Sequence, residues 1–182
     1  MFTDVATLLG ELRQDHRNMA LLLDLLEAES ELVSSDDEPD LELLRDIMRY
    51  MTVYSDAVHH PREDVVYEVM REHSPELAAG LEGVVDDHAD IAALGGRLRA
   101  DVEGAIAGSA VKRDRLLHDL RDYVDRLRRH MQWEEDDLFR RADSLANESA
   151  GQRIDITGLA GSDPLFGATA VPSFANLASH LP

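Results

Sequence analysis

The chain has 182 residues, of which 44% are apolar and 5% aromatic, and it contains no cysteine. This length suits one domain with a sizeable core, and the lack of thiols excludes disulfides, thiolate nucleophiles and cysteine-held zinc or iron–sulfur clusters. Any bound metal must therefore be held by histidine and carboxylate. The formal net charge of −19 repels phosphate backbones and anionic lipids, so neither nucleic acid nor a membrane surface is expected as a partner.

The N-terminal stretch "MFTDVATLLGELRQDH" has no basic region followed by an apolar run. No segment approaches the ~18 uninterrupted apolar residues that a membrane span requires. We therefore expect neither an export signal nor a transmembrane helix, and the sequence predicts a cytoplasmic protein.

Leu, Ala, Glu, Asp and Arg dominate the composition, and apolar residues recur at three- and four-residue steps, which is typical of amphipathic helices. The pattern predicts four helices, over residues 3–31, 41–72, 81–102 and 111–146. The loop "SSDDEPD" separates the first two and supplies Asp40 as an N-cap. Long helices with short connections bury their apolar stripes most simply as an up-down-up-down four-helix bundle, so the predicted fold class is all-α.

The C-terminal part differs from the rest, because Gly, Pro and Ser become more frequent and the helical periodicity fades from Gly151 onward. We therefore divide the chain into a bundle, residues 1–148, and a tail, residues 149–182. The tail is expected to be irregular and to pack on the bundle through its Leu, Phe and Val side chains.

An internal repeat relates the two halves of the bundle. His16 and His88 are 72 residues apart, and His59 and His130 are 71 residues apart. The surrounding residues match as well, because an aspartate precedes both His16 and His88, while "HHPRED" and "HMQWEE" share the form H-x-x-x-E followed by a second acid. The chain is thus predicted to form two helical hairpins, each with one His on its first helix and His-x-x-x-Glu on its second.

The H-x-x-x-E spacing places both side chains on one helix face, about one turn apart, so that they can reach one ion or two adjacent ions. Imidazole and carboxylate donors suit iron, manganese or zinc, and two carboxylates that can bridge favour a dinuclear site. The predicted metal ligands are His16, His59, Glu63, His88, His130 and Glu134.

A single His on an apolar stripe is more often a hydrogen-bonded core residue, and a single H-x-x-x-E is more often a surface ion pair. All six residues together, however, would bury about two uncompensated charges without a cation, so metal binding is the better interpretation. We place the neighbouring His60, Asp64 and Glu135 outside the ligand set, either beside the ligands or exposed. We interpret Tyr123 as a core residue and expect Pro61 to kink its helix. The remaining histidines are interpreted as surface residues: His73, His118 and His180.

At these residues the chain resembles the hemerythrin-like (HHE cation-binding) domain family. The resemblance rests on "DH", "HHPRED", "DDH" and "HMQWEEDDLF" in the four helices and covers residues 1 to about 146, while "DPLFG" in the tail is similar to the segment after the bundle in bacterial members. It implies a non-heme di-iron centre with the six residues above as ligands, bridged by the two glutamates and an exogenous oxygen.

One position departs from the oxygen-carrying members of that family, which have a further histidine four residues after the one in the third helix. Here that position is Ala92. The resemblance then implies that one iron keeps an open or solvent-filled position, a pattern closer to the family branch implicated in iron–sulfur cluster repair and in nitric oxide or peroxide chemistry. Reversible oxygen transport is less expected.

A ferritin-like di-iron bundle would use Glu-x-x-His, and no histidine here has a glutamate three residues before it. Three functions stay open. The di-iron site binds or reacts with O2, nitric oxide or peroxide; or the protein repairs iron–sulfur clusters or donates iron; or the bundle is a structural, partner-binding protein. Whether the protein is an enzyme is left undecided, and the sequence indicates no particular protein partner.

Overall fold

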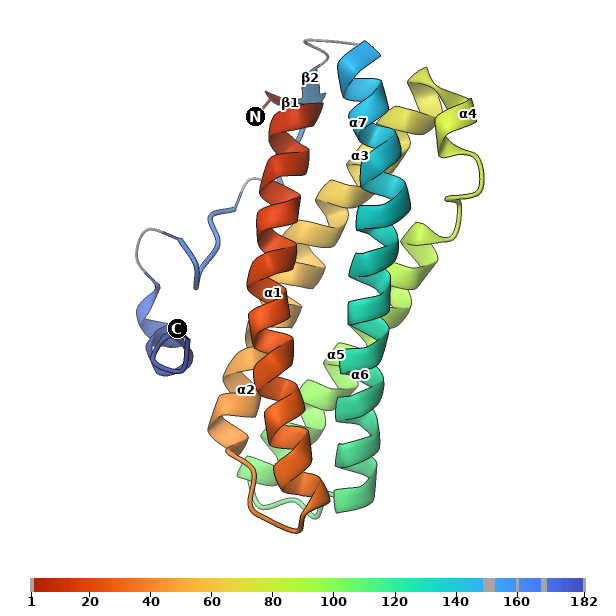
Figure 1. The fold of residues 1–182 in the computed structure, drawn as a ribbon. Coiled ribbons are helices and arrows are strands. Elements are labelled where there is room, and N and C mark those ends of the chain that lie inside the picture. Colours follow the sequence, from red (N-terminus) through yellow and green to blue (C-terminus); the bar gives the residue numbers. More distant parts are fainter. Residues whose placement is uncertain (1, 149–152, 160, 168–169, 182) are drawn as a thin grey trace.

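The computed structural model describes residues 2–148, 153–159, 161–167 and 170–181. It shows four long helical columns packed side by side (Figure 1), which confirms the predicted all-α bundle. The first column is α1 (Val5–Ser34) and the third is α5 (Val84–Ile106). The second and fourth columns are each made of three consecutive segments: α2 (Leu41–Tyr50), η1 (Met51–His59) and α3 (His60–His73); α6 (Arg113–Trp133), η2 (Glu134–Leu138) and α7 (Phe139–Glu148). The short α4 (Pro75–Ala78) lies in the connection between α3 and α5.

Side-chain caps begin the first two columns. The Asp4 carboxylate accepts a hydrogen bond from the Thr7 N–H at 2.8 Å, and the predicted N-cap Asp40 accepts one from the Leu43 N–H at 2.9 Å. These contacts satisfy backbone donors that have no partner within the helix. The α1 helix continues to Ser34, about one turn beyond the predicted end.

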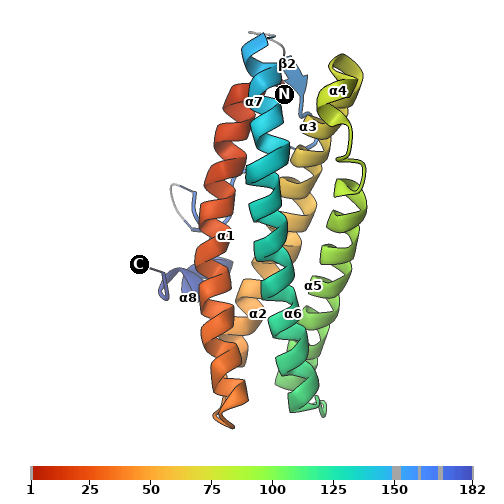
Figure 2. The same cartoon turned by 45° about the vertical axis from the view of Figure 1, so that its right-hand side comes forward.

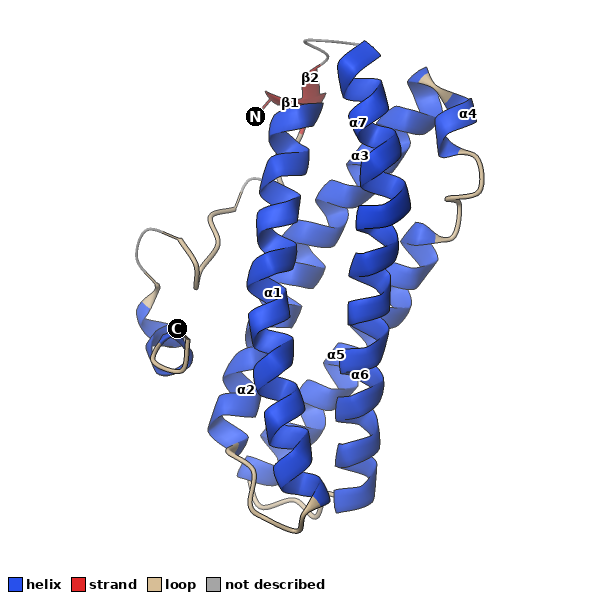
Figure 3. Ribbon diagram, in the orientation of Figure 1, coloured by secondary structure: helices blue, strands red, loops and turns tan. Residues whose placement is uncertain are grey.

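The segments η1 and η2 are π-helical, a feature that the periodicity did not predict, although both continue their columns without a break (Figure 3). In η1 the His60 N–H bonds to the Ser55 carbonyl, five residues back. Pro61 follows directly and has no N–H to continue an α-helical ladder. The sequence predicted a kink at this proline; the structure has a π segment that ends just before it, a feature that frequently accompanies functional sites.

The apolar interior is divided into two clusters, one toward each end of the bundle. One contains the buried side chains near the start of α1 and those of α3 and α7, and the other contains those in α2, α6, most of α5 and α1 from Met19 onward. Representative members are Leu8, Leu12, Val66 and Leu138 in the first cluster, and Met19, Leu44, Ile91 and Leu127 in the second. The histidine-bearing turns lie between the two clusters.

The C-terminal part begins beside the start of the first column and then runs along the bundle toward α2 (Figures 1 and 2). Strand β2 (Arg153–Asp155) pairs antiparallel with β1 (Phe2–Asp4), a short sheet that the sequence did not predict. Further along, η3 (Pro172–Phe174) and α8 (Ala175–Ala178) follow, and α8 contacts α2. The buried side chains Phe174 and Leu177 belong to the cluster that contains Met19.

The segment "DPLFG" fastens the tail to the second column. The Asp163 carboxylate accepts hydrogen bonds from the backbone N–H groups of Leu165 and Phe166, both at 2.8 Å, and from the Tyr50 hydroxyl at 2.9 Å. A Cβ at Gly167 would lie 2.7 Å from the Asp163 carbonyl oxygen, so this turn has no room for a side chain. The motif therefore forms a compact turn whose aspartate also reaches the bundle.

Within the described part of the chain, no helix combines the length and apolar character that crossing a membrane requires.

We expect Asp163→Ala to lower the free energy of unfolding by about 1–3 kcal/mol, because Tyr50 and the turn lose their shared acceptor. Denaturant unfolding would measure the loss, and limited proteolysis should cut the variant first between residues 153 and 167. Asp122→Ala, at an exposed position on α6, is the matched control. Equal stability of the two variants would show that the Asp163 contacts do not hold the tail.

Candidate metal centre

The six predicted ligands come from all four columns and meet between the two apolar clusters. Each is at most 5% exposed, and His59, Glu63 and Glu134 are fully buried. The first histidine of each hairpin lies on α1 or α5, and the H-x-x-x-E pairs span the second and fourth columns. The internal repeat of the sequence therefore appears as two similar halves around one central point.

The Glu63 carboxylate faces histidines from both hairpins. Its Oε1 lies 3.2 Å from Nε2 of His16 and 3.1 Å from Nε2 of His59, and its Oε2 lies 3.4 Å from Nε2 of His88. One carboxylate thus lies between imidazoles of the two halves.

Glu134 has the same arrangement in the second half. Its Oε1 lies 3.2 Å from Nε2 of both His88 and His130, and its Oε2 lies 3.4 Å from Nε2 of His16. All four imidazoles therefore present their Nε2 atoms to the central carboxylates, and both glutamates face both halves of the bundle.

The outer Nδ1 atoms of His59 and His130 face aspartates from the first helix of their own hairpin. Asp15 Oδ2 lies 3.1 Å from His59 Nδ1, whereas Asp87 Oδ2 lies 3.7 Å from His130 Nδ1, beyond hydrogen-bond distance. Asp15 also accepts from the Tyr54 hydroxyl at 3.2 Å. The two halves therefore share the same arrangement of aspartate and histidine, but the contact is shorter in the first half.

The outer nitrogens of His16 and His88 face acids from the opposite hairpin. His16 Nδ1 is 3.0 Å from Glu135 Oε1, and His88 Nδ1 is 2.8 Å from Asp64 Oδ1. A carboxylate on the outer nitrogen fixes the tautomer and orientation of a metal-binding imidazole and increases its basicity. The sequence carried a signal for these four acids, because each repeat has Asp before its first histidine and a second acid after its glutamate.

The carboxylates raise the pKa values of three of the ligand histidines; at His59, burial would lower the pKa, but Glu63 and Asp15 outweigh it. Burial alone would lower the pKa of His16, but Glu134, Glu135 and Glu63 outweigh it and raise this pKa to about 11. Burial likewise opposes Asp64 and Glu134 at His88, whose pKa is raised to about 10. In the metal-free protein the imidazoles of His16 and His88 are therefore protonated at neutral pH.

The central glutamates shift in the opposite direction. Burial and the neighbouring Glu134 would raise the pKa of Glu63, but His59 and His16 outweigh them and lower it to about 2. Burial also opposes ionisation of Glu134, yet His130, His16 and His88 hold its pKa well below the usual range. Both carboxylates are therefore anionic at neutral pH.

The donor set fits transition-metal ions. His59 Nε2, Glu63 Oε2, His130 Nε2 and Glu134 Oε2 are buried and make no hydrogen bond of acceptable geometry among the described residues. Buried polar atoms without partners are costly, and imidazole nitrogen with carboxylate oxygen suits iron, manganese or zinc.

The potential metal ligands form two groups, and within each group the donor atoms lie within 4.8 Å of one another. The first group consists of His16, His59 and Glu63. The second consists of His60, Glu63, His88 and His130, so Glu63 belongs to both. Each group is large enough to surround an ion. The shared carboxylate places the two groups side by side.

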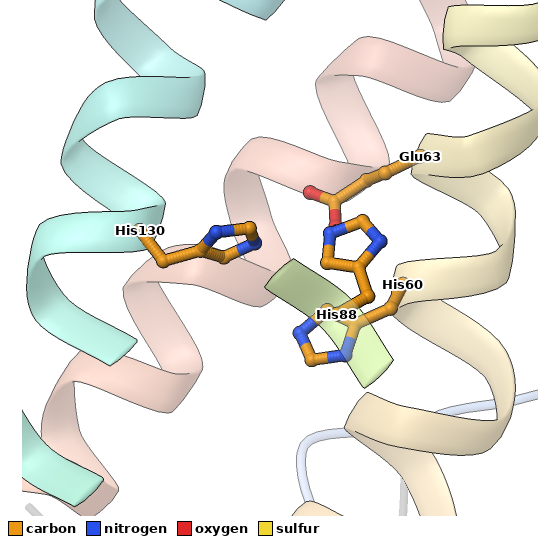
Figure 4. A group of neighbouring side chains, drawn as sticks. All are labelled: His60, Glu63, His88 and His130. Carbon is orange, nitrogen blue, oxygen red and sulfur yellow. The ribbon is translucent and has the colours of Figure 1, made fainter. Parts of the chain in front are cut away.

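Of the two places that the sequence left open for His60, beside the ligands or exposed, the structure shows the first. The side chain is 3% exposed and also belongs to the second donor group. Its ring stacks on that of His88, with ring centroids 4.5 Å apart and 8° between the planes (Figure 4). Helical periodicity could not place both adjacent histidines inside, because one falls about 100° around an α-helix from the other, whereas a π segment ends here.

The other polar residues lie where the sequence placed them. His73, His118 and His180 are exposed, and Tyr123 is buried in the core. A Cβ at Gly95 would lie 3.0 Å from the Tyr123 ring, so the glycine makes room for this side chain.

Comparison with known proteins agrees with this geometry. The model of the hemerythrin HHE cation-binding domain matches residues 7–142, which includes all four columns and all six predicted ligands. Neither the curated proteins nor the solved structures gave a match. Since the matched region covers most of the chain and the buried His and Glu groups can hold metal, the protein belongs to the hemerythrin HHE cation-binding family.

Proposed function

We propose that the protein binds two iron ions at the centre of the bundle, where a small ligand such as O2, nitric oxide or peroxide binds or reacts. The observation that carries this proposal is that Glu63 and Glu134 each face histidines of both hairpins, as bridging carboxylates would.

In this proposal His16 and His59 hold one ion, His88 and His130 hold the other, and the two glutamates lie between them. The pair of ions would supply redox chemistry and an exchangeable ligand position. The chain contributes dry surroundings, since the six side chains are at most 5% exposed, and the outer carboxylates orient the imidazoles. Ala92, in place of a further histidine, supports a vacant position at one of the ions.

Cavities on two sides favour a small ligand. One of about 520 Å³ is lined by Asp15, the carboxylate partner of His59, together with Arg62 and the tail residue Asp163. A second of about 330 Å³ is lined by Asp87 and His130 on the opposite hairpin. Both reach side chains that touch the metal-facing imidazoles, so the centre lies close to solvent although its own side chains are buried.

Replacing both Glu63 and Glu134 with Ala should abolish loading of two ions, because the proposed bridges are removed. Elemental analysis of protein reconstituted with Fe²⁺ without oxygen would count the ions. The double variant Glu72→Ala, Glu76→Ala removes the same charge from exposed positions and should retain both. Two irons in the Glu63, Glu134 variant would contradict the proposed ligand set.

Removing the metal should lower the melting temperature by roughly 5–10 °C for each bound ion, when the loaded protein is measured at a free metal concentration about a hundred times the dissociation constant. The ligands converge only in the folded chain, so binding free energy contributes to folding free energy. Differential scanning calorimetry of the loaded and verified metal-free protein would measure this. Identical curves would favour the alternative of a structural, partner-binding bundle.

Metal binding should release at least about two protons per chain at pH 7, because an imidazolium cannot bind an ion and both His16 and His88 are protonated in the metal-free protein. Their pKa values are raised above the usual ~6.5. The ion pairs of these two imidazolium groups with their carboxylates therefore contribute their full stabilisation of the metal-free fold below about pH 6.5. This stabilisation is lost as the pH rises through about 10 to 11, where the imidazoles lose their protons. Metal affinity should accordingly rise with pH.

A pH indicator in weak buffer would measure the released protons during titration with Zn²⁺, which has no redox reaction of its own. The Glu63, Glu134 variant is the control for protons released by other sites. Binding of two ions without proton release would show that the imidazoles are already neutral before loading.

A further inference from the structure

His60 is a buried histidine with poor hydrogen bonds. Its Nε2 lies 3.4 Å from the Ser55 hydroxyl and its Nδ1 lies 3.4 Å from Asp56 Oδ1, both longer than an ordinary hydrogen bond. Burying an imidazole without good partners is costly. The side chain is nevertheless 3% exposed and has a donor atom within 4.8 Å of those of Glu63, His88 and His130.

The internal repeat shows that His60 breaks the symmetry of the two halves. The position equivalent to it, directly after His130, is Met131. The ring stacked on the first histidine of each half also differs. Phe139 stacks on His16, with ring centroids 5.1 Å apart and 16° between the ring planes, whereas His60 stacks on His88, with centroids 4.5 Å apart and 8° between the planes. One half therefore has an additional imidazole where the other has apolar side chains.

His60 shares one further feature with the predicted ligands. Each of those four histidines has an acid facing its Nδ1, and His60 has Asp56 in the same place. Asp56 Oδ1 is itself buried and makes no hydrogen bond of acceptable geometry among the described residues. An acid on Nδ1 leaves Nε2 as the metal-binding atom, as in the other histidines.

We infer that His60 is a seventh metal ligand, the third imidazole of the ion held by His88 and His130, with Asp56 as its orienting carboxylate. The inference rests on the proposed two-ion site. Because the rings of His60 and His88 are parallel, one ion cannot lie in both ring planes, so His60 turns out of the stack when metal binds. The two 3.4 Å contacts and the ring contacts with His59, His88 and His130 oppose this turn, and metal binding must outweigh them.

This assignment changes which ion is expected to have the exchangeable position that Ala92 implies. The imidazole missing from α5 is supplied by the second column, so the ion beside His88 and His130 has three imidazoles and the other has two. The exchangeable position then belongs to the ion held by His16 and His59. The cavity of about 520 Å³ lies on this side of the site, because Asp15, the carboxylate partner of His59, lines it.

His60→Phe tests the inference, because phenylalanine keeps a flat, although larger, ring on His88 and removes both nitrogen atoms. Metal-free wild type and variant would be titrated with Co²⁺, whose visible absorption reports coordination number. Loss of a partner that merely orients a ligand typically weakens binding about 10–100-fold, so loss of the ligand itself should weaken one of the two ions at least about tenfold. The absorption of that ion should change as well.

Two further variants sharpen the test. His118→Phe, at an exposed position on α6, should leave both ions and their absorption unchanged. Adding Ala92→His to His60→Phe should restore the second ion, because position 92 follows His88 by about one helical turn. Melting curves of the metal-free proteins would verify that each variant is folded.

Unchanged affinity and absorption in His60→Phe would give His60 a packing role like that of Phe139 and overturn the inference, while leaving the two-ion site intact. A wild-type chain that binds only one ion, or none, would instead overturn the proposed function itself. The two failures are therefore distinguishable in the same titration.

Discussion

Two fully buried carboxylates, Glu63 and Glu134, set the main constraint on this bundle. Burying a charge far from water is costly unless opposite charge and hydrogen bonds compensate it. The chain meets this constraint with a polar layer across the middle of the bundle, in which four imidazoles surround the two carboxylates. The layer divides the apolar interior, so each cluster must hold the four columns together on its own side.

Charge balance explains why the layer suits both a metal-free and a loaded state. Four further acids face the outer nitrogens of the imidazoles, so six carboxylates surround four histidines. Two divalent ions would bring as much positive charge as four protonated imidazoles. The raised pKa values of His16 and His88 show that protons supply part of this charge in the metal-free chain. Protons and metal ions therefore compete for the same nitrogen atoms, and the fold is compatible with either.

Most of the fold could be predicted from the sequence, because the helical periodicity is strong and the repeat relates His16 to His88 and His59 to His130. The family and the all-α bundle are confirmed, and the six ligand positions do meet in one buried place. The π segments could not be predicted, since tertiary packing decides whether an N–H bonds to the fourth or the fifth preceding carbonyl. For that reason the sequence did not show that His60 is buried against His88. The pairing of β1 with β2 was missed because three-residue strands carry too little periodic signal, and their partners lie at opposite ends of the chain.

The differences between the two halves of the bundle all concern the surroundings of the two groups of ligands. The half that contains His16 is covered by Phe139, faces the larger cavity and lies under the tail, whose Asp163 reaches Tyr50. The half that contains His88 has the additional histidine and no described tail segment lining its cavity. In the proposed two-ion site, these differences would favour ligand exchange at the ion held by His16 and His59. The repeat brings the six predicted ligands together, and the departures from the repeat distinguish the two halves around them.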